Sequence, residues 1–221
     1  MSMRPIANSL VDQSRVANMD LRGHGRSSLD TEAYTSADVV GDMLGVADAA
    51  GLESPVLIGH SLGAKFVLAF ADSHPVRARA IVLLDTSIVE SRQRQANRLS
   101  ETENSRLEDL RTRVESMFLA SDESRQRRRI VESMLAMPRA AAAAALRAGD
   151  TVDTAAALAS CEMAVLYLAA SRPGEDPSIM KTLNPKMCFG QVIGSGHFVQ
   201  LDALPQVIAM IDQFVRLYAS R

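Results

Sequence analysis

The chain has 221 residues, of which 47% are hydrophobic, and a net charge of −2 with a pI of about 6.1. A chain of this length and composition can bury one substantial core, so we expect one domain with an insertion rather than two independent domains. The balanced charge gives no electrostatic reason to expect a nucleic acid or an anionic membrane surface as a partner.

The two cysteines and the N-terminal sequence indicate the cellular compartment in which we expect the protein. Cys161 and Cys188 are too few for a disulfide framework and are expected to be reduced and buried. Residues 1–5 lack the apolar stretch of a secretory signal, and no apolar run approaches the length of a membrane span. We therefore expect a cytoplasmic protein without a membrane span.

Apolar periodicity and turn residues define the predicted elements. In chain order they are a helix at 4–12, a strand at 15–21, a helix at 36–50, a strand at 55–58, a helix at 64–71, strands at 79–84, 165–168 and 187–193, and a helix at 204–218. Ser36 is the predicted N-cap of its helix and Gly51 the predicted stop. Continuous apolar runs alternating with helices predict an α/β fold with a mostly parallel, doubly wound sheet.

Residues 88–160 interrupt the alternation of strands and helices. They show helical periodicity without strand signals and include an alanine run, Ala140 to Ala145, with high helix propensity. We interpret them as a helical cap, inserted into a core made of residues 1–87 and 161–221.

The segment Gly59 to Gly63 carries the pattern G-x-S-x-G between an apolar strand and a helix. A sharp strand-to-helix turn of this kind raises a serine hydroxyl above the sheet edge, where a histidine can take its proton. Ser61 is therefore the predicted nucleophile.

His197 is the predicted general base among four histidines. It follows the last strand in a glycine-flanked loop, at the carboxyl end of a strand, where open α/β sheets place their ligands. His60 is adjacent to Ser61, so its side chain should point away from the serine. His24, between two glycines, is expected to have a structural role.

Three segments together resemble the α/β-hydrolase superfamily. Residues 20–27 are similar to its D-x-R-G-x-G-x-S turn, residues 59–63 to its nucleophile elbow, and residues 194–198 to its histidine loop. The resemblance implies an α/β-hydrolase core with a cap after the family's sixth strand, at 79–84. The chain lacks room for the family's first three strands and for the His-Gly loop that supplies an oxyanion donor. We therefore expect a shortened hydrolase, from a truncated gene model or a decayed gene.

The acid of the triad has two candidates. The family's acid usually lies just past the strand at 165–168, where Asp176 is found, but Asp176 also has the pattern of a helix N-cap before Pro177. Asp85, at the end of the strand at 79–84, is the alternative that some members use. Asp176 is slightly preferred, and either would orient His197. The Leu62 backbone N–H is the one oxyanion donor that the sequence identifies.

These residues predict a serine hydrolase that cleaves a small ester or related acyl compound through a Ser-His-Asp triad and an acyl-enzyme. No cofactor or metal is implied, and the expected partner is a small-molecule acyl substrate. The alternative is a catalytically impaired or silent α/β-hydrolase-like protein that binds a small hydrophobic ligand or a partner. Thioesterase, lipase and acyltransferase chemistry would use the same residues.

Overall fold

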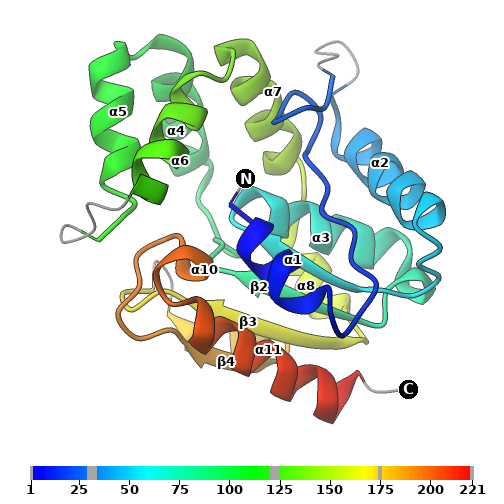
Figure 1. The fold of residues 1–221 in the computed structure, drawn as a ribbon. Coiled ribbons are helices and arrows are strands. Elements are labelled where there is room, and N and C mark those ends of the chain that lie inside the picture. Colours follow the sequence, from blue (N-terminus) through cyan, green and yellow to red (C-terminus); the bar gives the residue numbers. More distant parts are fainter. Residues whose placement is uncertain (1, 29–33, 120–124, 174–175, 220–221) are drawn as a thin grey trace.

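A four-stranded parallel sheet forms the centre of the molecule. The computed structural model describes residues 2–28, 34–119, 125–173 and 176–219. The strands, in the order in which they lie side by side, are β1 (Val56–His60), β2 (Ala80–Leu84), β3 (Ala164–Ala169) and β4 (Cys188–Gln191), all parallel (Figure 1). The mostly parallel α/β architecture predicted from the sequence is confirmed.

Helices connect and cover the strands. They are α1 (Arg4–Leu10), α2 (Ser36–Ala49), α3 (Leu62–Ser73), α4 (Arg92–Asn104), α5 (Leu107–Glu115), α6 (Arg125–Leu135), α7 (Arg139–Asp150), α8 (Thr154–Ser160), α9 (Pro177–Leu183), α10 (Val199–Asp202) and α11 (Leu204–Tyr218), with a 3-10 turn at Pro75–Arg77. The predicted final helix matches α11 at both ends.

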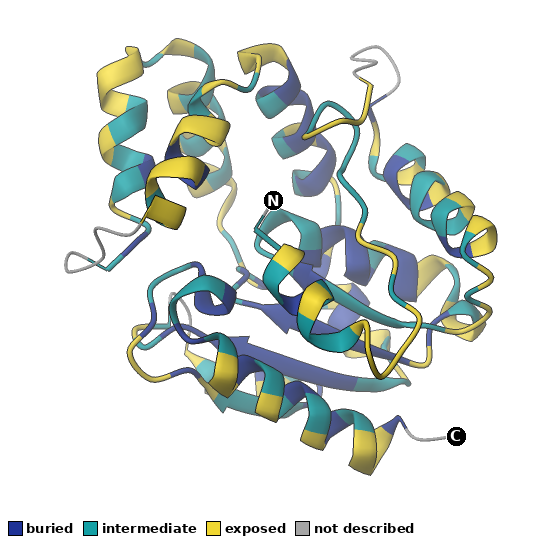
Figure 2. Ribbon diagram, in the orientation of Figure 1, coloured by how far each residue is buried: buried dark blue, intermediate teal, exposed yellow. Residues whose placement is uncertain are grey.

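The two faces of the sheet bury separate apolar layers. On one face, alternate residues of β2 and β3 pack against α1, α10 and α11, including Ile6 and Ile211. On the other face, the intervening residues pack against α3, α8 and α9, including Leu68 and Leu158. Figure 2 shows β2 and β3 as the most buried strands. Their continuous apolar sequences follow from burial on both faces.

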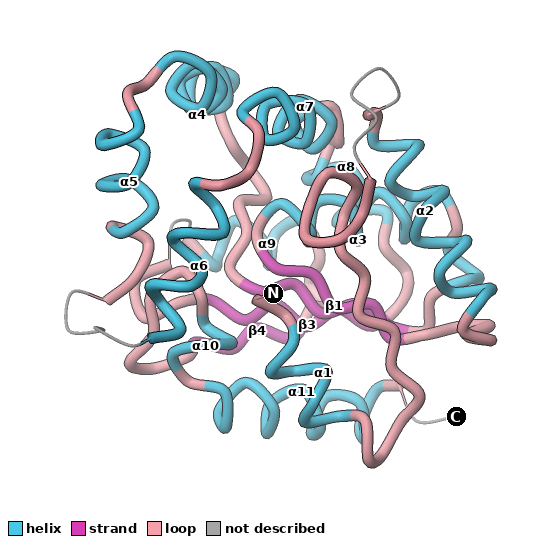
Figure 3. The backbone as a smooth tube through the Cα atoms, turned by 45° about the horizontal axis from the view of Figure 1, so that its top comes forward, coloured by secondary structure: helices cyan, strands magenta, loops and turns pink. Residues whose placement is uncertain are grey.

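The strand predicted at residues 15–21 is wrong. This segment carries no helix or strand and runs as an elongated loop between α1 and α2 (Figure 3). A strand is defined by a ladder of backbone hydrogen bonds to a neighbour, and none of the described strands pairs with it. Four of its seven residues are apolar, but β1, at the edge of the described sheet, pairs only with β2.

The N-cap of α2 differs from the predicted one. Thr35, not Ser36, is the N-cap: its side chain accepts a hydrogen bond from the Asp38 N–H at 3.2 Å, and its N–H donates to the Asp38 carboxylate at 2.9 Å. Thr35 has the extended backbone that a cap requires, whereas Ser36 is already helical. Gly51, at φ +62°, follows the helix end as predicted.

Helices α4 to α7 lie together at one end of the molecule (Figure 1). Within this group α4 packs on α7 and α5 on α6, whereas α8 packs on α3 in the main body. The division of the chain into core and cap at residues 88 and 160 stays a prediction.

A buried ion cluster joins α3 to the helices above it. The Lys65 ammonium lies 2.9 Å from Asp150 and 3.2 Å from Glu90, and the Arg98 guanidinium contacts the same two carboxylates at 2.6 and 2.5 Å. Burial alone would raise the pKa of Glu90, but the hydrogen bond and charge of Arg98, together with Lys65, outweigh it and hold that pKa below its ordinary value. The cluster balances two positive against two negative charges in a water-poor position.

Replacing Lys65 with methionine should lower the free energy of unfolding by about 3 kcal/mol, because it leaves two buried carboxylates facing one guanidinium. Urea denaturation measures the loss. Arg106→Met is the matched control, since the Arg106–Glu108 pair has side chains 81% and 85% exposed and should change stability by less than about 0.5 kcal/mol. Equal losses in the two variants would contradict a stabilising role for the cluster.

Candidate active site

The turn between β1 and α3 holds Ser61 in a strained backbone conformation. Its φ of +52° and ψ of −120° lie outside the regions that residues with a Cβ favour. The Ser61 N–H donates to the Leu84 carbonyl at 3.0 Å, and its carbonyl accepts from the Thr86 hydroxyl at 2.9 Å. These bonds fix the turn against β2.

Gly59 is needed for this turn because the chain returns very close to it. A Cβ on Gly59 would lie 2.6 Å from the Ala64 Cα and 2.7 Å from the Gly63 carbonyl oxygen, and both are backbone atoms that cannot move aside. The predicted elbow therefore has the geometry that its glycine pattern indicates.

Leu62 is the first residue of α3, where backbone N–H groups point out of the helix end without an internal partner. Within the residues that the structure describes, the Leu62 N–H makes no hydrogen bond. It is thus available to an anion beside the serine, as expected for an oxyanion donor.

Asp85 and His197 form a direct hydrogen bond. The His197 Nδ1 lies 2.7 Å from the Asp85 Oδ2, and the side chains are 26% and 14% exposed. The other carboxylate oxygen of Asp85 accepts from the Ala170 N–H at 2.9 Å. Because a carboxylate only accepts, Nδ1 carries the proton and Nε2 is left as the acceptor nitrogen. Asp85 also has a strained backbone, with φ at +38°.

The structure does not bring Asp176 to His197. Asp176 is exposed and is the N-cap of α9, where its carboxylate accepts from the Ser178 N–H at 2.8 Å. This hydrogen bond lowers the pKa of Asp176 below its ordinary value. The slight sequence preference for Asp176 as the acid is therefore corrected. Asp176 is a helix N-cap, as its position before Pro177 indicated, and Asp85 is the carboxylate beside the imidazole.

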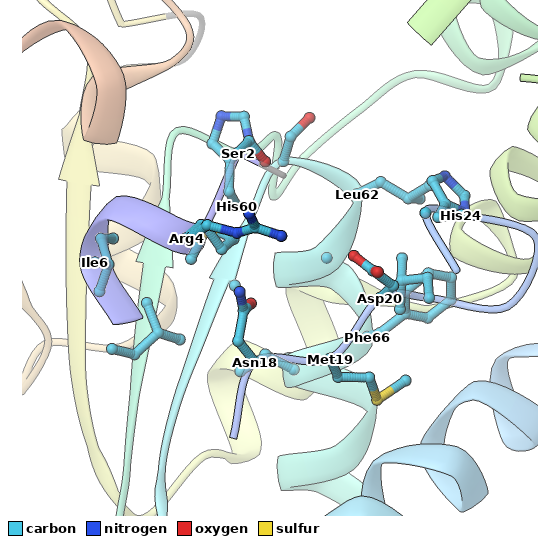
Figure 4. Close-up of a pocket in the computed structure, with 18 of the residues that line it drawn as sticks. Ser2, Arg4, Ile6, Asn18, Met19, Asp20, His24, His60, Leu62 and Phe66 are labelled. Carbon is cyan, nitrogen blue, oxygen red and sulfur yellow. The ribbon is translucent and has the colours of Figure 1, made fainter. Parts of the chain in front are cut away.

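Ser61, Leu62 and His197 line one large cavity of about 1700 Å³. Figure 4 shows part of its wall, which includes Asp20, His24, His60 and Leu62. Among the described residues no hydrogen bond joins the Ser61 hydroxyl to the ring of His197. Catalytic hydrogen bonds are often long before substrate binds. The structure thus places the serine and the imidazole along the same cavity, without a hydrogen bond between their side chains.

The loop that carries His197 is fixed from several sides. The His197 N–H donates to the Met117 carbonyl at 2.9 Å, and the Gly196 N–H donates to the Asp202 carboxylate at 2.7 Å. A Cβ on Gly196 would lie 2.8 Å from the Met117 carbonyl oxygen, so only glycine permits this approach. The position of the imidazole therefore depends on the segment between α5 and α6.

His60 contributes to the site in a way that the sequence did not show. Its Nε2 lies 2.8 Å from the His197 carbonyl oxygen, and the two rings are 4.6 Å apart. A carbonyl only accepts, so His60 Nε2 donates and this tautomer is fixed. Burial of the ring and, secondly, the neighbouring His197 lower the pKa of His60 to about 3. His60 is thus a neutral donor that holds the backbone of His197.

His60 should make the fold sensitive to acid. Its pKa is about 3 in the fold against 6.5 for an unperturbed histidine, so the unfolded chain binds the proton first and stability falls as the pH drops below about 6.5. His60→Gln keeps an N–H donor but does not titrate. The unfolding free energy of the unmodified protein should fall more steeply than that of His60→Gln, by up to about 1.4 kcal/mol per pH unit, down to about pH 4. Urea denaturation at each pH measures this difference. The same dependence of the unfolding free energy on pH in both proteins would contradict the prediction.

In the parts of the chain with described side chains, no three His, Cys, Asp or Glu residues converge as metal ligands would. No helix in those parts is long and apolar enough to cross a membrane. Both cysteines are free and only half-buried, which corrects the expectation that they are buried.

Curated relatives match short parts of the chain. Epoxide hydrolase B of Mycobacterium tuberculosis is 41% identical over 70 residues, which cover 31% of this chain and 20% of that protein. The 2-hydroxymuconate semialdehyde hydrolase of Pseudomonas sp. is 35% identical over 85 residues, covering 38% of this chain and 30% of that protein. The matches thus span less than a third of each relative's length.

Solved structures match nearly the whole chain. The enol-lactonase of Burkholderia xenovorans superposes with a TM-score of 0.84 at 18% identity, covering 97% of this chain and 86% of that one. A thermophilic esterase of Thermogutta terrifontis gives a TM-score of 0.84 at 23% identity, covering 97% and 84%. At these identities the likeness establishes the fold. The family model described as "alpha/beta hydrolase fold" matches residues 2–134, more than half of the sequence. With this match added to the sheet and the elbow, the chain belongs to the alpha/beta hydrolase family.

Proposed function

We propose that the protein is a serine hydrolase that cleaves a small ester or related acyl compound. Ser61 is the nucleophile, His197 the general base and Asp85 the acid that orients it. The observation that carries the proposal is the 2.7 Å hydrogen bond between Asp85 and His197, at the cavity that the elbow serine also lines. Ester-cleaving relatives of the same fold, such as the Thermogutta esterase, agree with it.

The reaction follows from the hydrogen-bonding roles of these groups. Nε2 of His197 takes the proton of the Ser61 hydroxyl while its oxygen attacks the acyl carbon. The proton then passes from Nε2 to the leaving alkoxide, and the acyl group stays on Ser61 as an ester. A water molecule, deprotonated by the same nitrogen, then attacks this ester. The acyl group leaves as a carboxylic acid and the proton on Nε2 passes to the serine oxygen, which restores the hydroxyl. Asp85 stabilises the imidazolium in both steps without itself taking the proton.

The negatively charged oxygen of each tetrahedral intermediate needs hydrogen-bond donors to stabilise it. The Leu62 N–H, unpaired at the start of α3, is the first. Removal of one donor from an oxyanion hole costs roughly 10²- to 10³-fold in turnover. Activity through Leu62 alone would therefore be weak but measurable, and the acyl-enzyme should be easier to detect than rapid turnover.

A fluorophosphonate probe tests the nucleophile. The purified protein should become covalently labelled, because the oxygen of an activated serine attacks the phosphorus of the probe and displaces fluoride, and Ser61→Ala should lose the label entirely. Ser100→Ala, at an exposed serine of α4, is the matched control and should label like the unmodified protein. Intact-mass spectrometry measures the adduct. A folded protein that takes no label would instead indicate the catalytically silent, ligand-binding alternative.

Substitution of the two aspartates tests the acid. Asp85→Asn should reduce the labelling rate by about 10²- to 10⁴-fold, because the amide favours the wrong imidazole tautomer. Its oxygen can still accept from Ala170, so the local fold should survive. Asp176→Asn should leave the rate unchanged, since that side chain only caps α9. The assignment of Asp85 would be overturned if the Asp176 variant lost activity and the Asp85 variant kept it.

A further inference from the structure

Helices α4 to α7 and their connecting loops supply one wall of the cavity that Ser61 lines. The charged side chains that line this wall are Arg98, Arg113 and Arg139, and among the described residues of the segment no carboxylate lines it. The rest of the cavity differs, because carboxylates such as Asp20 and Asp212 line it together with arginines. An anion is therefore favoured at the α4–α7 side.

One of these arginines is not paired with a carboxylate. Arg98 shares Glu90 and Asp150 with Lys65, and the Arg113 guanidinium lies 3.0 Å from the Glu101 carboxylate. The Arg139 guanidinium instead donates to the Glu103 carbonyl at 3.2 Å, and no described carboxylate lies within ion-pair distance of it. Arg139 is therefore the group on this wall whose positive charge is not compensated locally.

Helix α7 leads from the elbow to Arg139. It lies above the start of α3 (Figure 1). One face of α7 carries the residues spaced three and four apart, which are Arg139, Ala142, Leu146 and Gly149. The first three line the cavity, and a Cβ on Gly149 would lie 2.3 Å from the Leu62 Cδ1. This end of α7 therefore touches the residue after the proposed nucleophile, and about 15 Å of helix separates it from Arg139.

Apolar side chains dominate the space between these two ends. Those from α5, α6 and the loops that follow them are Leu110, Val114, Met117, Ile130, Leu135 and Met137. Methionine side chains adapt to apolar groups of varied shape. A ligand that lies along α7 would therefore meet apolar groups over most of its length and a guanidinium at its far end.

We propose that the substrate is an ester whose apolar acyl chain ends in a carboxylate, and that Arg139 binds this carboxylate. The ester end of the inference rests on the proposed function. The Leu62 N–H would hold the acyl oxygen, so the chain attached to that carbon starts where α7 contacts Leu62. A guanidinium matches the planar, two-oxygen geometry of a carboxylate. The neighbouring Arg113 adds to the positive potential.

Isothermal titration calorimetry with octanoate and octanamide tests the anion site in the full-length protein. At pH 8 octanoate is ionised and should bind at least about tenfold more tightly than the neutral amide, because it accepts charge-assisted hydrogen bonds. Arg139→Gln should reduce this ratio to less than threefold. Arg125→Gln is the matched control, since Arg125 is exposed on α6 and does not line the cavity, and it should keep the ratio.

Two results of the calorimetry would overturn the proposal. The first is a ratio below threefold in the unmodified protein. The second is an unchanged ratio in Arg139→Gln, which would place the carboxylate elsewhere, such as at the Leu62 N–H.

The ion pair between Arg113 and Glu101 provides a test with opposite signs. Arg113→Gln removes a positive charge from the cavity wall and should weaken octanoate binding by about two- to fivefold. Glu101→Gln removes the partner charge, which does not line the cavity, and should strengthen binding by a similar factor. A purely structural role of the pair would shift the affinity in the same direction in both variants, and that result would contradict the part assigned to Arg113.

Hydrolysis separates this inference from the proposed function. Mono-p-nitrophenyl octanedioate and its neutral methyl ester share one acyl chain, and the free acid should be cleaved with at least about tenfold higher kcat/KM. Arg139→Gln should lower this preference to less than threefold. Equal kcat/KM for the two esters would overturn the inference and leave the hydrolase standing. Cleavage of neither ester, with an octanoate preference that depends on Arg139, would contradict the hydrolase and support the anion site.

Discussion

The tight turn at Ser61 is the constraint on which the rest of the site depends. A residue with a Cβ at φ +52° costs of order 1–3 kcal/mol and persists only where the surrounding structure holds it. Here the holding contacts come from β2, through Leu84 and Thr86, and from the close approach of Gly59 to α3. The same turn leaves the Leu62 N–H at the helix end, so one strained turn positions both the proposed nucleophile and the proposed anion donor.

The imidazole is positioned by contacts from three directions. Asp85, itself at a positive φ, bonds the ring, His60 bonds the loop carbonyl, and Met117 accepts from the loop N–H. Asp85 and His60 stand at the ends of neighbouring strands, whose register places His60 opposite Leu84. Because parallel strands end at the same edge of the sheet, groups far apart in sequence meet there. The Met117 contact adds a dependence on the helices above the site, which the Lys65 ion cluster ties to α3.

The sequence predicted what is encoded locally and missed what depends on pairing across the fold. The strands at 79–84 and 165–168, the elbow at Ser61 and the loop of His197 follow from apolar runs and glycine spacing. The sequence slightly favoured Asp176 over Asp85, and chain order alone does not say which carboxylate reaches the ring. The position of Asp176 before Pro177 already indicated a helix N-cap. The sequence predicts that the His60 side chain points away from Ser61, but nothing in the sequence indicates its hydrogen bond to the His197 carbonyl. Residues 15–21 have strand-like composition, but a strand also requires a neighbour.

The hydrogen bonds that hold the proposed triad do not depend on the outer edge of β1. Asp85 is held by Ala170, directly after β3, and the Ser61 backbone is held by β2; neither bond involves the outer edge of β1. The geometry of these groups can therefore persist while β1 lacks an outer neighbour. Among the described residues, the outward N–H and C=O groups of Val56, Ile58 and His60 have no backbone partner, so water in the cavity is left to hydrate them.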